Sequence, residues 1–297
     1  MIFYDFNDKI NRFMFAYMYE LEVALKTKKY ALATVSFQSD EANTDRPLKL
    51  FLKDFIEKNF NSLPLSKMNF KFNIGINDTV ENLNYSDFKD IKIRKVLLPD
   101  ELSNELKLQI AKNKSSVYTN PDLLLEICDS NNTTYCSIEL KSTKNNSIPG
   151  SSIQQITPTE WVIFIKHTNK DIDITTGQYI HSINSKLQFP DRSPRPQVAF
   201  NALTSWNTSN RSLDDNTLSY KINSVDEKLK YDLISDWQYY LADRWIEVLF
   251  SSSTKNNEPW YNNNLRKFII KFLEKYDDLN SEEKENFKNK VNSLIKE

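Results

Sequence analysis

Glycine and histidine are both scarce in this chain of 297 residues. Its only glycines are Gly75, Gly150 and Gly177, and no two of them lie close together in the sequence. Phosphate-binding loops of the P-loop and Rossmann kinds need clustered glycines, which let backbone amides approach the phosphate. The only histidines are His167 and His181. The sequence therefore excludes these nucleotide-binding loops and argues against a multi-histidine metal site or an HNH-type nuclease.

Cysteine and long apolar runs are scarce as well. Cys128 and Cys136 are the only cysteines, and their spacing is not that of a CxxC motif. Neither a disulfide framework nor a zinc ribbon is expected, and a reducing compartment fits this usage. No stretch approaches the roughly 18 apolar residues of a membrane span, and the N-terminus lacks the basic start of a signal peptide. We expect a cytoplasmic protein with no membrane partner.

The charges nearly cancel, with a net charge of -1 at pH 7. Binding to a polyanion would therefore need a local concentration of Lys and Arg. Hydrophobic residues make up 39% and charged residues 27% of the chain, which is typical of a folded protein. The length fits one large domain, so we expect a single domain over residues 1–297. The alternative is a separate helical C-terminal lobe over residues 225–297.

Apolar residues recur at helical spacing in both terminal parts of the chain. Pro99-Asp100-Glu101 is a typical helix start, and the helix it begins would run to Ile110, just before the central segment. The other predicted helices cover residues 8–32, 47–60, 225–249, 264–276 and 281–295.

The middle of the chain changes to short apolar runs. Residues 123–128 and 135–140 are two such runs, and the polar segment between them indicates a β-hairpin. The run at 161–165 is β-branched and aromatic, which favours a buried strand. Further strands are expected at 179–183 and 197–203. The expected fold class is α/β (α+β), a central mixed β-sheet flanked by helices, with helical N- and C-terminal parts.

Two carboxylates and a lysine lie on the predicted hairpin. Asp122 directly follows Pro121, and Glu139-Leu140-Lys141 closes the second apolar run. Pro-Asp and Glu-x-Lys each occur at two other places in the chain, but only this pair lies on adjacent apolar runs. The context therefore selects Asp122, Glu139 and Lys141.

Strand alternation defines what these residues could do together. Glu139 and Lys141 would share the face opposite to Leu140, by the two-residue period of a strand. One Mg²⁺ ion could then be bound by Asp122, Glu139 and the carbonyl oxygen of Leu140, with Lys141 beside the attacking water. The alternative interpretation is a solvated hairpin in which Glu139 and Lys141 form an exposed polar face.

Pro121-Asp122 and Glu139-Leu140-Lys141 resemble the two halves of the PD-(D/E)xK motif. The stretch of about residues 100–167 resembles the PD-(D/E)xK nuclease superfamily, and in particular the type II restriction endonucleases. The resemblance implies a restriction-endonuclease-like sheet and magnesium bound by Asp122 and Glu139. It also implies that Lys141 orients or deprotonates the nucleophilic water and that the products carry a 5′-phosphate.

Two family variations bear on this resemblance. Some members add a glutamate from the preceding helix, and Glu101 or Glu105 could take that part. The RecB-like nucleases carry a Gln-x-x-x-Tyr element after the lysine. Here Pro158 and Thr159 stand at the offset of the tyrosine, so the restriction-enzyme branch is preferred.

Polar segments beside the motif are candidates for binding DNA. Hydroxyls, amides and basic side chains contact phosphates, and Asn or Gln can pair with adenine in the major groove. An ordinary surface loop is the alternative for each of these residues. The candidates are Ser142, Thr143, Lys144, Asn145, Ser151, Ser152, Gln154 and Gln155 after the motif, and Arg192 and Arg195 in a proline-bearing loop.

The function predicted from the sequence is that of a type II restriction endonuclease. Such an enzyme would hydrolyse double-stranded DNA at a specific sequence with Mg²⁺ as cofactor. It would act as a homodimer, because a palindromic site imposes two-fold symmetry, and the family implies a companion DNA methyltransferase. The alternatives are a DNA repair or junction nuclease of the same superfamily, and a non-catalytic DNA-binding protein.

Overall fold

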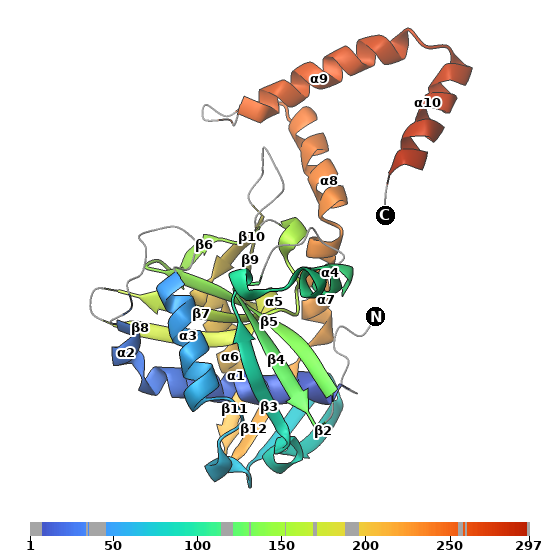
Figure 1. The fold of residues 1–297 in the computed structure, drawn as a ribbon. Coiled ribbons are helices and arrows are strands. Elements are labelled where there is room, and N and C mark those ends of the chain that lie inside the picture. The colour runs from blue at the N-terminus through green and yellow to red at the C-terminus, as the bar shows by residue number, and fades with distance from the viewer. Residues whose placement is uncertain are drawn as a thin grey trace. The chain divides into compact units, whose positions relative to one another are not determined.

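Figure 1 shows the computed structural model of the chain. The structure describes residues 8–33, 35, 46–113, 121–130, 132–151, 153–168, 171–187, 196–254, 258 and 260–295. The chain divides into two compact units, Met1–Ser235 and Asp236–Glu297. The boundary lies after α7 (Ser224–Ser235), so this helix belongs to the first unit.

The main sheet of the first unit has five strands and carries the predicted hairpin. Its neighbouring strands are antiparallel except β5 and β7, which are parallel. The apolar side chains of β7 are buried on both faces, as the continuous apolar run predicted. In spatial order the strands are β3 (Ile91–Leu97), β4 (Leu123–Asp129), β5 (Asn132–Thr143), β7 (Trp161–His167) and β8 (Ile172–Gln178).

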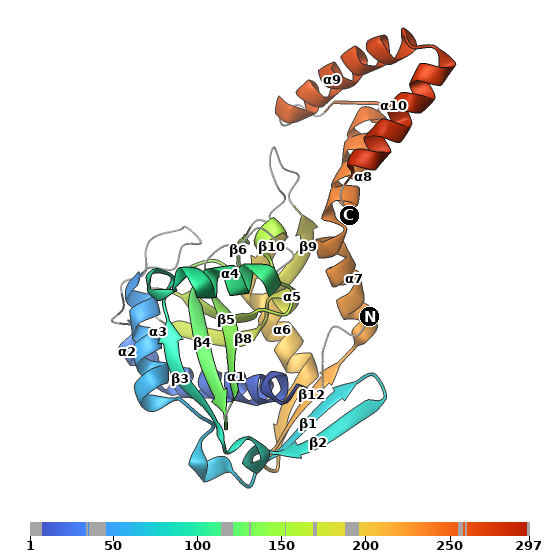
Figure 2. The same cartoon turned by 45° about the vertical axis from the view of Figure 1, so that its right-hand side comes forward.

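Two smaller sheets contain the other strands of this unit that the structure describes. In the four-stranded sheet β1 pairs with β12 in parallel and with β2 as an antiparallel hairpin whose second strand forms an edge (Figure 2). Its spatial order is β11 (Arg211–Asp214), β12 (Thr217–Ile222), β1 (Lys71–Ile76) and β2 (Thr79–Asn84). The three-stranded sheet has the order β6 (Ser147–Pro149), β10 (Pro196–Ala199) and β9 (Ile183–Leu187).

Helices pack against these sheets. α3 runs beside β3 at the edge of the main sheet (Figures 1 and 2). The α-helices of the first unit, besides α7, are α1 (Lys9–Thr27), α2 (Lys29–Ala33), α3 (Arg46–Asn59), α4 (Asn104–Asn113), α5 (Tyr179–Ser182) and α6 (Phe200–Asn210). The short 3-10 helices are η1 (Leu65–Lys67), η2 (Tyr85–Phe88), η3 (Pro99–Glu101) and η4 (Ile153–Gln155).

The helix α1 forms the centre of the hydrophobic core. Six consecutive residues in its middle, from Phe13 to Met18, are buried, so it has no solvent face there. The ring of Phe15 meets Trp161 of β7 at 5.0 Å and Tyr220 of β12 at 5.1 Å between ring centroids. α1 therefore lies between the five-stranded and the four-stranded sheets, which accounts for its unusually apolar sequence.

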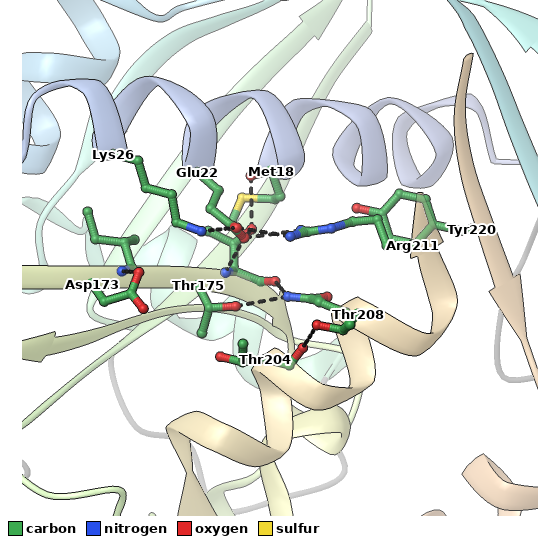
Figure 3. A network of polar contacts seen from close by, with 12 residues as sticks. Met18, Glu22, Lys26, Asp173, Thr175, Thr204, Thr208, Arg211 and Tyr220 are labelled. Carbon is green, nitrogen blue, oxygen red and sulfur yellow. Dashed lines mark hydrogen bonds and ion pairs between the residues drawn. The ribbon is translucent and has the colours of Figure 1, made fainter. Parts of the chain in front are cut away.

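A buried ionic network holds the C-terminal half of α1 in place. Arg211 donates to both carboxylate oxygens of Glu22, at 3.1 and 2.9 Å, and Lys26 binds the same carboxylate at 2.8 Å. Figure 3 shows Lys26 and Arg211 approaching Glu22 from opposite sides. The backbone N–H of Thr176 on β8 also donates to Glu22 at 2.8 Å. The network lines a cavity of about 290 Å³ and links α1 to β8 and β11.

In the described residues of the second unit the helices are α8 (Trp237–Leu249), α9 (Trp260–Asp277) and α10 (Ser281–Leu294). Phe272 and Tyr276 of α9 pack against Phe287 of α10, with ring centroids 5.9 and 6.2 Å apart. Asn280 and Glu283 form a capping box that fixes the start of α10. The two last helices therefore form a hairpin held by aromatic contacts.

The mixed α/β architecture, the hairpin and the terminal helices confirm the coarse predictions, but one predicted strand was wrong and another was right only in its first part. Residues 179–183 begin with the helical turn α5, because the N–H of Tyr179 donates to the carbonyl of Glu160 and that of Ile180 to Pro158. Residues 197–203 leave the strand at Ala199 and enter α6, where a spacing of three to four residues buries the apolar side chains. None of the described helices combines the length and apolar character needed to cross a membrane.

Candidate active site

The hairpin of β4 and β5 brings the predicted carboxylates to one end of the main sheet. The β4–β5 pairing extends to Leu123, which lies opposite Ile138. Asp122 comes just before this last pair, and its Oδ2 accepts the backbone N–H of Leu140 at 2.8 Å. A side-chain carboxylate thus takes over from the β4 backbone as partner of β5. The chemistry-bearing residues lie where the antiparallel ladder ends.

The alternation along β5 follows the sequence prediction. Ile138 and Leu140 are fully buried in the core. Glu139 and Lys141 meet on the opposite face, with Lys141 Nζ 2.5 Å from Glu139 Oε1. The alternative interpretation, an exposed polar face, does not fit Lys141, because its side chain is only 5% exposed. The side chain of Glu139 is 17% exposed. The lysine is enclosed while one side of its carboxylate partner still reaches solvent.

The loop after β6 encloses Lys141. Ser151 Oγ donates to Glu139 Oε1 at 3.0 Å and accepts from Lys141 Nζ at 3.2 Å. The N–H of Ser151 in turn donates to the hydroxyl of Tyr179 at 3.0 Å. A Cβ atom on Gly150 would lie 2.5 Å from that same hydroxyl, so the approach requires glycine. Ser151 therefore belongs to the cluster itself, and sequence reasoning missed both Gly150 and Tyr179 as its supports.

A second lysine reaches the cluster from α3. Lys49 Nζ lies 2.5 Å from Asp122 Oδ1, and the two side chains are 19% and 18% exposed. Lys49 is 73 positions before Asp122 in the sequence, and no motif links them. The only signal was the basic row formed on α3 by Arg46, Lys49 and Lys53, which the helical pattern alone would assign to the solvent face.

The charges of the cluster shift its ionisation equilibria. Burial raises the pKa of Asp122, the charge of Glu139 raises it further, and Lys49 opposes both, so the net direction is upward. Burial lowers the pKa of Lys141, but Glu139, Tyr179 and Asp122 together outweigh this effect and hold the pKa above its ordinary value. Lys141 is therefore an ammonium group at neutral pH and acts as a hydrogen-bond donor and a positive charge.

The carboxylates and one backbone carbonyl form the candidate metal ligands. In a strand the N–H and C=O of one residue point to the same side. Because the N–H of Leu140 faces Asp122, its carbonyl faces the same side, where β4 has ended. Asp122, Glu139 and this carbonyl are hard oxygen donors, which fit a small divalent cation such as Mg²⁺. Over the described ranges no three His, Cys, Asp or Glu side chains form a metal cluster, so water and phosphate oxygens would complete the shell.

The predicted DNA-binding residues differ in accessibility. Ser142 and Thr143 end β5 and are buried, and Thr143 Oγ1 accepts the N–H of Asn145 at 2.9 Å. Lys144 and Asn145 follow and are exposed. Gln155 lies half-buried in η4. Ser152, Arg192 and Arg195, and the side chain of Gln154, lie outside the described residues.

The candidate helical glutamates have other partners. Glu101 lies in η3, where its carboxylate binds Lys53 at 2.6 Å and caps the N–H of Leu98 at 2.8 Å. Glu105 lies in the first turn of α4. Lys49, rather than either glutamate, is the helical residue that the structure brings to Asp122.

Comparisons with known proteins do not assign a family. No family model matches the chain, and no curated protein is significantly similar to it in sequence. The function is therefore argued from the geometry of the site.

Proposed function

We propose that this protein is a magnesium-dependent endonuclease that hydrolyses double-stranded DNA, of the type II restriction kind that the PD-(D/E)xK resemblance implies. One observation carries the proposal: Asp122, Glu139 and Lys141 meet at the end of the β4–β5 ladder, joined through Leu140 and Ser151.

Each residue has a role that its contacts support. The Leu140 N–H fixes one oxygen of Asp122, and a cation would have to take the other oxygen from Lys49. Glu139 is fixed by Ser151 and supplies the second carboxylate. A bound Mg²⁺ ion would lower the pKa of a water nucleophile and neutralise charge on the phosphate. Lys141, held as an ammonium group, orients that water and stabilises the negative charge that builds up on the phosphate oxygens.

The proposal includes the substrate and the partners expected from the sequence. The exposed Lys144 and Asn145 adjoin the catalytic strand and supply a cation and an amide for a DNA backbone. The products would carry 5′-phosphates. A homodimer would match a palindromic site, and a cognate DNA methyltransferase would protect the host's own copies of it.

The test is plasmid cleavage by the wild type and by paired variants. Wild type should give discrete fragments with Mg²⁺ and none with EDTA. Lys141→Ala and Asp122→Asn should each lower the cleavage rate at least 100-fold, and Lys141→Ala should still bind DNA.

Two matched controls come from the other copies of the motif. Asp100→Asn removes the carboxylate of another Pro-Asp pair, which binds Arg46 on the surface, and Lys107→Ala removes the lysine of another Glu-x-Lys string. Both should cleave at the wild-type rate. Cleavage that survives Lys141→Ala, or that proceeds in EDTA, would overturn the proposal. Preference for a branched over a supercoiled substrate would instead indicate a repair or junction nuclease.

A further inference from the structure

The helix α3 presents a row of cations to the acidic end of the main sheet. Each makes an ion pair with a residue that lies far away in the sequence. The pairs are Arg46 with Asp100 at 2.9 Å, Lys49 with Asp122 at 2.5 Å, and Lys53 with Glu101 at 2.6 Å. Only the middle pair involves a residue of the proposed catalytic cluster.

The two oxygens of Asp122 have different partners. Oδ2 accepts the N–H of Leu140, and Oδ1 binds Lys49. The backbone bond is part of the strand architecture, whereas the ammonium group sits at the end of a flexible side chain. Oδ1 is therefore the oxygen that a cation would use, and Lys49 already occupies it.

The charges of the cluster balance without a metal. Asp122 and Glu139 contribute two negative charges, and Lys49 and Lys141 contribute two positive charges. A divalent cation added to this arrangement would leave an excess of two positive charges within a few ångströms, which is unfavourable in a partly buried site. Lys141 is enclosed by Ser151, but Lys49 is 19% exposed and can swing outward.

We infer that Lys49 is an internal counter-cation of the metal site: it neutralises Asp122 before a metal binds, competes with the metal for Oδ1, and after displacement pairs with a DNA phosphate. This inference rests on the proposed function. The displaced ammonium group remains tethered beside the cluster, where the phosphate charge would balance it. One side chain would thus weaken metal binding and strengthen DNA binding.

Lys49→Met tests both effects, because it removes the charge and keeps a long flexible side chain. The first measurement is Mn²⁺ binding by calorimetry at pH 8 without DNA. The variant should bind Mn²⁺ about tenfold more tightly than the wild type, since the ion pair that competes with the metal is only partly screened. The second is DNA binding in the presence of Mg²⁺, measured in a Lys141→Ala background. There Lys49→Met should weaken DNA binding and reduce the slope of log K against log salt by about 0.9.

Lys53→Met is the matched control. It lies one helical turn further along α3, its side chain is 18% exposed, and its partner Glu101 is outside the cluster. Lys53→Met should leave Mn²⁺ affinity unchanged. If Lys49→Met does not fold, Lys49→Gln replaces it and should show the same tighter Mn²⁺ binding and weaker DNA binding. A loss of positive charge that acted only on fold stability would not change the two affinities in opposite directions.

The outcomes separate this inference from the proposed function. Unchanged Mn²⁺ affinity in Lys49→Met, with binding abolished by Asp122→Asn, would overturn the role of Lys49 and leave the metal site standing. Mn²⁺ binding that is weaker in Lys49→Met would also overturn it. A wild type that binds no Mn²⁺, or that binds it equally well with Asp122→Asn, would overturn the proposed metal site and this inference with it.

Discussion

Replacing Arg211 by methionine should destabilise the first unit strongly, because it leaves a buried carboxylate without its main partner. Glu22 is 4% exposed and Arg211 10% exposed at the side chain, and two hydrogen bonds join them. Removing one partner of such a pair costs about 3–5 kcal/mol. Lys26 still binds Glu22, and the adjoining cavity of about 290 Å³ can admit water. The cost should therefore lie at the lower end of this energy range. We expect a loss of about 3 kcal/mol in the free energy of unfolding at pH 7.

Chemical and thermal unfolding of the full chain would measure this loss. At about 2–4 °C per kcal/mol for a unit of this size, Tm should fall by about 6–12 °C. The control is Arg94→Met, whose side chain is 71% exposed and contacts Glu126 at 3.4 Å. It should change the free energy of unfolding by less than about 0.5 kcal/mol. A loss as small in Arg211→Met as in Arg94→Met would refute the reasoning.

A compensating variant and the pH dependence refine the same prediction. Adding Glu22→Gln to Arg211→Met removes the unpaired charge and keeps an acceptor for Thr176, so most of the lost stability should return. Burial raises the pKa of Glu22, but Arg211 and Lys26 outweigh it and bring the pKa below its ordinary 4.5. The unfolded chain therefore takes up the proton first as the pH falls. In the wild type, the stability that these ion pairs give through Glu22 should be full above about pH 4.5 and should shrink below it.

Two further predictions concern the supports of the site. Gly150→Ala should cost about 2 kcal/mol of stability and slow cleavage at least tenfold, because the new Cβ would lie 2.5 Å from the Tyr179 hydroxyl and 2.6 Å from the carbonyl oxygen of Pro196. Gly75→Ala, whose nearest neighbours are at 3.5 Å, should leave cleavage unchanged, and equal rates in both variants would contradict the packing argument. Burial lowers the pKa of His181 below 6.5, so the unfolded chain binds a proton more readily and stability should fall as the pH drops below 6.5. The free energy of unfolding of His181→Gln should depend less on pH between about pH 7.5 and 5.5 than that of the wild type. An equal pH dependence in the two proteins would contradict the lowered pKa of His181.

The sequence predicted what depends on neighbouring residues. The period of two in residues 138–141 placed Ile138 and Leu140 in the core and Glu139 and Lys141 together. The helical spacing at the two ends of the chain was equally local. The turn at Tyr179 was missed because its conformation depends on carbonyl acceptors some twenty positions earlier, which a local pattern does not contain.

Contacts between distant segments were beyond reach of the pattern. Lys49 meets Asp122 and Arg211 meets Glu22 only because the sheets and α1 bring those segments together, 73 and 189 positions apart. Taken singly, each of these charged residues is of a type that is common on the surface of a helix or strand. The convergence of Asp122, Glu139 and Lys141 could be predicted, whereas the lysine that pairs with Asp122 could not.

The most direct test of the central claim is the sequencing of DNA fragment ends. Wild-type protein would be incubated with a mapped plasmid and Mg²⁺, and the ends of all fragments would be sequenced and tested for 5′-phosphates. The account predicts the same short sequence at every end, a 5′-phosphate on each strand, and no fragments from Lys141→Ala. Ends scattered at random, or fragments that persist with Lys141→Ala, would contradict it.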